Sequence, residues 1–364
     1  MLARFRVLLP FAFSVPQGAK FQSEEFDKDG YHIRVHPPYQ ASTSVGALDD
    51  PSLPVSDILQ KLHPADPIVI DQGITIDGVG TIRANAIQID VWRSDFDRRA
   101  ATSNTPGSND PPIELLFGIL NSYLDRARSV GRAHVVHRVE QGASCWRLEF
   151  LSDAEEELSP GLGKARARNG ASFTMTIAGL TPALWQAACQ LPANFQPKAW
   201  ETLLLDAEAH LPAIVPSIFL AAAALETLIA AALIALAPSE RMPAELWEFI
   251  NNRGDYRKEA SVAEQFDQLL HALTGHSLKE KPDLWEAFRN IREARNTLMH
   301  EGSMVVGNAE VTRVQAFAFI VRTKEIADWI EEFLPPHAKR SPLGPLMQMQ
   351  VSRALILNPP SPAI

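Results

Sequence analysis

The sequence predicts an α+β protein, with a β-rich first half and an all-α helical bundle in the second half. Short β-branched runs bounded by Gly, Pro or Asp recur in the first half. Beyond Pro197 the apolar residues take helical spacing, and the short connections suit a bundle of about five helices. We therefore expect a β-rich domain over residues 1–190, a helical bundle over 196–334 and a Pro-rich tail over 335–364.

The first expected strand, residues 1–15, also resembles a signal peptide. Arg4 and Arg6 precede an apolar stretch, but Pro10 interrupts it and no convincing cleavage site follows. A strand is therefore predicted in place of an export signal. Further strands are expected at 31–35, 67–70, 74–76 and 86–91, with one hairpin made of 133–139 and 144–150 and another over 165–177.

Helices account for the rest of the expected structure. One amphipathic helix, over 112–128, interrupts the strands after a Ser-, Asn-, Pro- and Gly-rich loop at 101–111. In the second half, helices are expected at 198–210, 218–237, 245–251, 260–273, 283–301 and 309–334. Pro282 and Gly302 flank the helix 283–301 at the positions where helices favour these residue types.

Composition narrows the class of function. The net charge of -9 argues against a general nucleic-acid coat, so any RNA contact must come from a local patch. Cys145 and Cys189 are the two cysteines of the sequence, which indicates a reducing cytoplasm and no disulfide framework. The apolar run 218–237 is long enough to span a bilayer, but a carboxylate at Glu226 would cost about 2.5–3.5 kcal/mol there. A core helix of a soluble bundle is predicted, and no membrane.

The helix 283–301 contains the residues with the most chemical potential. One face of this helix is an apolar stripe at spacings of three and four residues, made of Leu284, Phe288, Ile291 and Leu298. The spacing calls for one more residue of the stripe at position 295, and that residue is Arg295. Arg295 is therefore expected in the middle of the core-facing side, where an unpaired charge would be very costly. The neighbouring face is polar, cationic and aromatic, with Trp285, Arg289, Arg292, Asn296 and His300.

Two interpretations of Arg295 stay open. It could be a structural arginine paired with Glu226, the carboxylate of the Ala-rich helix, or it could lie at the rim of the bundle and present its guanidinium to a phosphate. His300 could favour a helix end simply as a cation near the negative dipole end, or it could transfer protons. Asn296, one turn earlier, could orient the His300 ring or be a solvated amide.

The segment Arg295-Asn296-Thr297-Leu298-Met299-His300 resembles the R-N-x-x-x-H signature of HEPN domains. The upstream run Ala224-Leu225-Glu226-Thr227-Leu228 is similar to the A-L-E-x-L run of the same superfamily, and the resemblance covers about residues 197–334. It implies a dimeric helical bundle, and in active members a metal-independent endoribonuclease. Gly302 stands where HEPN toxins that are regulated by adenylylation have a tyrosine, so that regulation is not implied.

The resemblance also implies roles for the residues. His300 would act on the ribose 2′-hydroxyl or the leaving oxygen, Arg295 would stabilise the scissile phosphate, and Asn296 would position His300 or the phosphate. Arg292 and Arg289 would add a cationic floor. RNA, a second copy of the chain and an antitoxin or trigger protein are the partners implied, with no metal or other cofactor, and the biological setting would be a toxin or phage-defence system.

Other sequence features receive the plainer interpretation. Gly161-Leu162-Gly163-Lys164 lacks the spacing of a phosphate loop. The pairs His32/His36 and His134/His137 lie in no recognisable metal-ligand pattern, and the two cysteines are expected to be packed thiols.

The competing function for the bundle is a non-catalytic dimerisation, RNA-binding or sensor module. Because Arg295 and His300 are not expected to share a helix face, a nuclease of this type is predicted to be a dimer.

Overall fold

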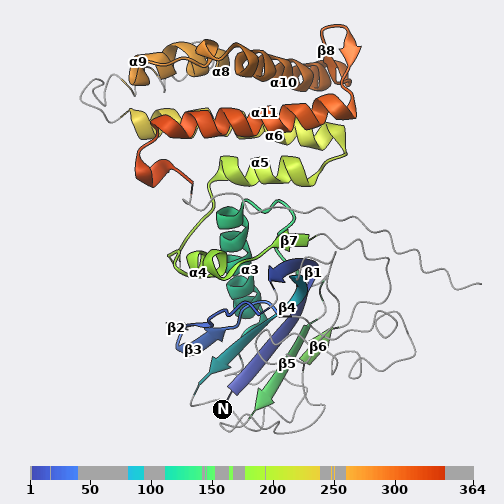
Figure 1. The fold of residues 1–364 in the computed structure, drawn as a ribbon, viewed down its shortest axis with the longest axis vertical. Helices are drawn as coiled ribbons and strands as arrows, with labels where there is room; N and C mark the ends of the chain where they lie inside the picture. Colours follow the sequence, from blue (N-terminus) through green and yellow to red (C-terminus); the bar gives the residue numbers. More distant parts are fainter. Residues whose placement is uncertain are drawn as a thin grey trace, which may run out of the picture. The chain divides into compact units, whose positions relative to one another are not determined.

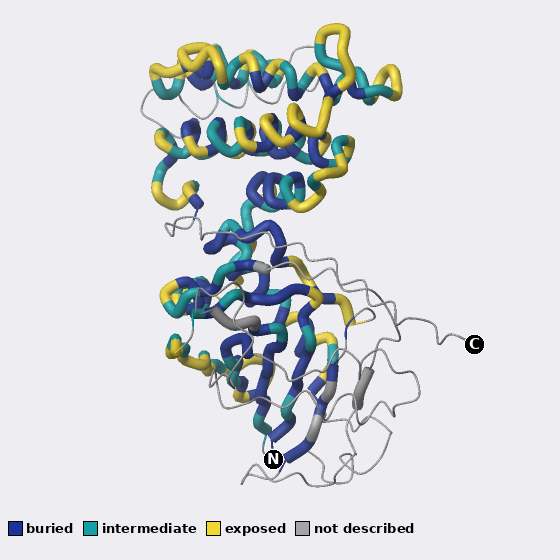
Figure 2. The backbone as a smooth tube through the Cα atoms, turned by 45° about the vertical axis from the view of Figure 1, so that its right-hand side comes forward, coloured by how far each residue is buried: buried dark blue, intermediate teal, exposed yellow. Residues whose placement is uncertain are grey.

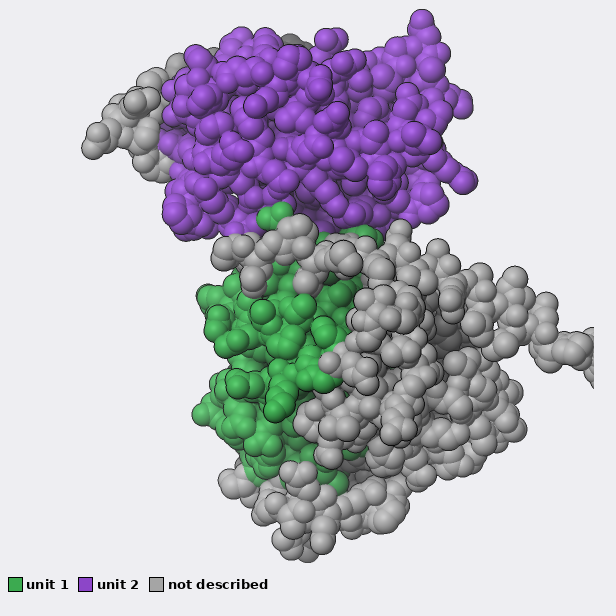
Figure 3. All heavy atoms as spheres, in the orientation of Figure 1, with its two compact units in different colours: residues 1–195, 343–364 green, residues 196–342 purple. Residues whose placement is uncertain are grey.

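The described part of the chain forms two compact units, which divide between Phe195 and Gln196 (Figures 1 and 3). The computed structural model describes residues 2–16, 18–39, 81–93, 111–141, 144, 146–151, 164–166, 177–192, 194–237, 247, 250 and 260–340. The first unit is built on an antiparallel sheet and the second is helical, so the predicted α+β class is confirmed.

The first unit is a sheet with strand order β2-β3-β4-β1-β5-β6, and β7 pairs in parallel with β1. Its elements are β1 (Leu2–Pro16), β2 (Glu24–Lys28), β3 (Tyr31–Val35), β4 (Thr81–Trp92), α3 (Ile113–Gly131), β5 (Trp146–Leu151), β6 (Lys164–Arg166), β7 (Ile177–Gly179) and α4 (Pro182–Cys189). The strand predicted at the N-terminus is therefore present, as are the predicted strands at 31–35 and 86–91. The N-terminal strand β1 lies in the middle of the sheet and is mostly buried (Figure 2).

The two faces of this sheet differ in chemistry because side chains alternate along a strand. Phe5 on β1 points to the apolar face, where its ring lies 5.4 Å from that of Phe117 on α3. The opposite face carries the buried polar residues Arg6, Gln88 and Asp90. One face therefore supplies the hydrophobic core, and the other supplies a hydrogen-bonded polar layer.

The hairpin predicted from 133–139 and 144–150 is wrong in its first arm. Residues 133–139 form no strand, and β5 pairs instead with β1. The backbone of the irregular segment bonds to a side chain: Asn121 on α3 accepts from Val139 N at 2.7 Å and donates to Val139 O at 3.1 Å. The β-branched residues Val135 and Val136 are buried in the core, which gave the segment a strand-like pattern.

The second unit is helical (Figure 1). Its elements are α5 (Ala199–Ala209), α6 (Ile214–Leu236), α8 (Val262–Glu264), the π-helical η2 (Gln265–Leu269), α9 (Leu270–Thr274), η3 (Leu278–Glu280), α10 (Pro282–Glu301), β8 (Val305–Val306), β9 (Ala309–Glu310), α11 (Arg313–Phe333) and η4 (Pro336–Ala338). The last long helix was predicted from 309. It begins at Arg313, because Thr312 caps it with Gln315 and the preceding residues pair in the β8–β9 hairpin.

The Ala-rich helix α6 packs against α5, α10 and α11. It is the one described helix that is long and apolar enough to cross a membrane by length and composition, with a mean hydropathy of 2.3 over its most apolar window. Half of that window is buried inside the bundle. The core helix of a soluble protein passes the same test of length and composition, so these properties alone do not identify a membrane span.

Several predicted elements lie outside the described residues. They are the strands 67–70 and 74–76, the turn of the hairpin 165–177, the loop 101–110, most of the helix 245–251, and the tail beyond Arg340. The helix α4 was not predicted. Thr181 accepts a hydrogen bond from Leu184 N and Pro182 opens the first turn, which together are a recognisable start signal for a helix.

Candidate functional site

The helix α10 carries the predicted site, and its ends follow from the sequence. Pro282 occupies the first turn of α10, as Pro182 does in α4. Its missing N–H costs no hydrogen bond at that position. Gly302 follows the last turn with φ 74°, a left-handed conformation that glycine adopts without a Cβ clash. The side facing the bundle core is formed by Ala287, Phe288, Ile291 and Ala294, all buried.

Arg295 lies at the rim of the bundle rather than in the middle of its core-facing side. Its side chain is 35% exposed, and the fully buried Ala294 takes the place that the sequence assigned to it. Adjacent residues on an α-helix point about 100° apart, so a core-facing Ala294 turns Arg295 toward the rim. The prediction of depth is therefore wrong.

The predicted partner of Arg295 is confirmed. Its Nη2 lies 3.8 Å from Glu226 Oε2 on α6, and the glutamate side chain is 33% exposed. Its Nη1 donates to Asn296 Oδ1 at 3.1 Å. The guanidinium is thus oriented by a carboxylate and an amide, and keeps an exposed side.

His300 lies on the last turn of α10 and is exposed. Asn296 does not orient its ring, since the side-chain oxygen of Asn296 accepts a hydrogen bond from Arg295 instead. None of the described residues forms a side-chain hydrogen bond or ion pair with His300. The structure therefore groups Arg295, Asn296 and Glu226, and leaves His300 accessible one turn further along.

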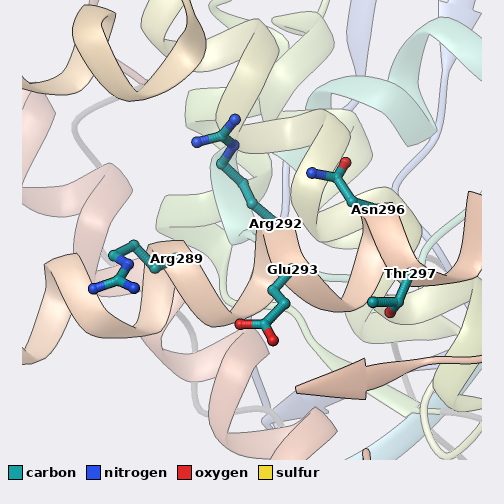
Figure 4. A pocket seen from close by; sticks show the side chains of 5 residues that line it. All are labelled: Arg289, Arg292, Glu293, Asn296 and Thr297. Carbon is teal, nitrogen blue, oxygen red and sulfur yellow. The ribbon is translucent and has the colours of Figure 1, made fainter. Parts of the chain in front are cut away.

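A shallow hollow of about 300 Å³ lies along the same helix. It is lined by Arg289, Arg292, Glu293, Asn296 and Thr297. Figure 4 shows Arg292 and Asn296 pointing to one side of α10, and Glu293 and Thr297 pointing to the other. The hollow brings three of the predicted residues together, namely Arg289, Arg292 and Asn296.

Arg292 is held above an aromatic ring. Its Cζ lies 5.4 Å from the ring centroid of Phe288, one turn earlier on α10. A cation–π contact of this kind contributes about 0.5–1 kcal/mol at an exposed site. The contact limits the positions of the guanidinium while its donors stay available to an anion such as phosphate.

The roles of Glu293 and Thr297 were not predicted from the sequence. Both side chains attach the β8–β9 hairpin to α10. Thr297 Oγ1 accepts from Val305 N at 3.0 Å and lies 3.1 Å from Val305 O, while Glu293 Oε1 accepts from Gly307 N at 2.7 Å. A hairpin signal was present in Gly307-Asn308 between short β-branched and apolar residues. The hairpin fixes the chain that follows the last turn of α10.

Among the described residues of both units, no group of three or more His, Cys, Asp or Glu side chains could hold a metal ion.

The first unit contains the cysteine whose surroundings the structure describes. Burial raises the pKa of the Cys189 thiol, with the nearby carboxylate of Glu24 acting in the same direction. Cys189 is partly buried and packs against the core of the first unit, as predicted, while Cys145 lies outside the described residues.

Comparison with known proteins gives no relative. No protein-family model, no curated protein and no solved structure matches the chain.

Proposed function

We propose that the chain is a metal-independent endoribonuclease of HEPN type, a toxin or phage-defence effector of the cytoplasm, with a composite site formed across a homodimer. The observation that carries the proposal is the geometry of α10. Arg295 is held at the bundle rim by Glu226 and Asn296, and His300 is exposed one turn further on. The resemblance of this segment to the R-N-x-x-x-H signature supplies the reaction class.

The proposed reaction is an internal transesterification of RNA. The ribose 2′-oxygen forms a bond to phosphorus, the bond to the 5′-oxygen breaks, and a 2′,3′-cyclic phosphate results. His300 takes the proton of the 2′-hydroxyl or gives one to the leaving oxygen. Arg295 stabilises the charge that develops on the phosphate oxygens. The requirement for a 2′-hydroxyl selects RNA over DNA.

One copy of the helix cannot bring Arg295 and His300 to the same point in space. Residues five positions apart on an α-helix differ by about 140° in direction, at about 100° per residue. A second α10 approaching from the exposed side would place the arginine of one copy near the histidine of the other. The dimer therefore resolves a geometric problem that a single chain leaves open.

Exposed apolar residues at the same end of the bundle support the dimer. The first turns of α11 present Val314, Phe317 and Val321, exposed by 80%, 61% and 38%, at the spacing of one helix face. Met299, next to His300, is 60% exposed. We call these four residues the apolar edge. An exposed apolar helix face, such as the one that Val314, Phe317 and Val321 form on α11, is typical of an interaction surface.

RNA would approach this end of the bundle along the hollow. Arg289 and Arg292, which precede Arg295 on α10, offer guanidinium groups to neighbouring phosphates, and the amide N–H groups of Asn296 offer further donors. The chain has a net charge of -9, so binding rests on this local patch.

RNA cleavage in EDTA tests the proposal. We expect wild-type protein to give 2′,3′-cyclic phosphate ends and His300→Ala to lose cleavage by at least about 100-fold, the lower range for general acid–base catalysis. His271→Ala is the matched control, since His271 is an exposed helical histidine of the same unit outside the motif. If His300→Ala cleaved RNA at the same rate as His271→Ala, the proposed nuclease site would be refuted.

The alternative is a non-catalytic dimerisation, RNA-binding or sensor bundle. The engagement of Arg295 with both Glu226 and Asn296 favours it, because those contacts could exist for packing alone. In that case RNA binding, measured by fluorescence anisotropy, would weaken in Arg292→Ala, while no RNA would be cleaved by the wild type.

A further inference from the structure

A serine, a histidine and an aspartate meet at one end of the β2-β3-β4 part of the sheet. Ser23 directly precedes β2 and His36 directly follows β3. Because Glu24 pairs with Val35 in the antiparallel register, Ser23 and His36 face each other just beyond that pair. Asp90 lies on the adjacent strand β4, opposite Arg34 of β3. Segments far apart in the sequence thus bring three polar side chains together.

The distances connect these groups in a line. Ser23 Oγ lies 3.2 Å from His36 Nδ1, and His36 Nε2 lies 3.0 Å from Asp90 Oδ2. The Asp90 side chain is 1% exposed and the His36 side chain 20% exposed, while Ser23 is exposed. The line runs from a buried carboxylate, through the imidazole, to a hydroxyl that solvent can reach.

The charge state of Asp90 sets the tautomer of His36. Burial raises the pKa of Asp90, but hydrogen bonds from His36 and Arg4 outweigh it, and the pKa lies below its usual value. An ionised carboxylate only accepts hydrogen bonds, so His36 Nε2 must be the donor. In the neutral ring Nδ1 then carries the lone pair, and the Ser23 hydroxyl donates to it. This is the arrangement that draws a proton from a nucleophilic hydroxyl.

Neighbouring contacts hold the three groups in place. Trp185 Nε1 donates to Gln22 O at 2.8 Å, and Tyr123 donates through its hydroxyl to the Glu24 carboxylate. The residues on both sides of Ser23 are therefore anchored. His36 N donates to Gln88 O at 2.9 Å on the strand that carries Asp90. These contacts fix the backbone around Ser23 and His36, so the hydroxyl and the imidazole are held within reach of each other.

We propose that Ser23 is a nucleophile activated by His36 and Asp90, and that this end of the sheet hydrolyses carboxylic esters. The observation is independent of the helical unit and of its proposed ribonuclease activity. Arg4, whose Nε donates to Asp90 Oδ1 at 2.9 Å, is a positioning residue that keeps the carboxylate ionised and fixed.

The chemistry balances without a cofactor. Ser23 Oγ forms a bond to the ester carbonyl carbon while its proton passes to His36 Nδ1. The carbon–oxygen bond to the alcohol breaks, and the alcohol leaves with the proton from Nδ1. Water then attacks the acyl-serine, gives a proton to Nδ1 and releases the acid, which restores the Ser23 hydroxyl.

A fluorophosphonate probe tests the nucleophile on the full chain. The Ser23 oxygen displaces fluoride from phosphorus and a covalent adduct remains, which peptide mass spectrometry locates. We expect Ser23→Ala and His36→Gln each to lower the labelling rate at least tenfold. Ser261→Ala is the matched control and should label as the wild type does, since Ser261 is exposed and its hydroxyl serves only to cap α8. Thermal melts identify a variant that has lost its fold.

A cysteine scan separates activation from mere exposure. Ser23→Cys should react with iodoacetamide at least tenfold faster than Ser261→Cys at pH 7, because His36 would draw the proton from the thiol. Adding His36→Gln should remove that advantage. Equal alkylation rates at the two positions, or an adduct on another serine that His36→Gln leaves unchanged, would overturn the proposal.

Discussion

The contact between Arg295 and Glu226 decides between the two interpretations of Arg295, and Glu226→Gln is the change that tests it. The substitution keeps the shape of the side chain and removes its charge. At 3.8 Å, two unit charges interact by about 1 kcal/mol in bulk water and about 4 kcal/mol at the effective dielectric of a protein surface. Both side chains are about one third exposed, so solvent and side-chain entropy reduce the net value to about 0–1 kcal/mol.

We therefore expect Glu226→Gln to lower the melting temperature of the helical unit by no more than about 4 °C. RNA cleavage should fall further, by about tenfold, because the guanidinium loses its orientation toward the phosphate. Glu325→Gln is the matched control: it removes the similarly exposed Arg322–Glu325 pair on α11 and should leave cleavage unchanged. Differential scanning calorimetry and a cleavage assay measure the two effects. A loss of stability above about 3 kcal/mol, with cleavage falling only in proportion, would show that Arg295 is a structural arginine.

Three further predictions follow from the contacts. Asp90→Asn should destabilise the first unit by about 3–5 kcal/mol, because the part-buried guanidinium of Arg4 loses the buried carboxylate that balances its charge. Since the folded pKa of Asp90 is lowered, its stabilisation is present above its unfolded pKa of about 3.9 and is lost as the pH falls below that value, so melting curves of this variant should vary less with pH there. Thr297→Val should free the backbone of Val305 at a cost of about 1–3 kcal/mol, seen as faster amide exchange of the β8–β9 hairpin with α10 intact. Phe317→Asp should convert the proposed dimer to a monomer in sedimentation velocity and abolish cleavage; a monomeric wild type would contradict the composite site.

The sequence predicted those parts of the fold for which local signals and burial agree. The boundaries of α10 followed from Pro282 and Gly302, and its pairing with α6 followed from the solitary carboxylate of Glu226. Prediction failed where a side chain replaces backbone pairing, as Asn121 does for the segment 133–139. The predicted burial of Arg295 was wrong because helical periodicity alone cannot decide which of two adjacent residues faces the core. In the structure Ala294, and not Arg295, takes the core-facing position.

The polar sites depend on contacts that the sequence does not order. Ser23, His36 and Asp90 have no motif spacing, and only the strand register places them together. Glu293 and Thr297 serve the β8–β9 hairpin through hydrogen bonds whose partners lie in a later turn. Both sets required the pairing of strands and hairpins to be known first.

The composition of α6 has a consequence for how the protein can be shortened and produced. Glu226 is the single charged side chain between Ile214 and Leu236. A fragment that ends before Arg313 would lack α11 and would expose apolar α6 side chains that α11 covers in the bundle. Such a fragment should aggregate or partition into detergent, and soluble expression of the helical unit therefore requires the chain at least to Phe333.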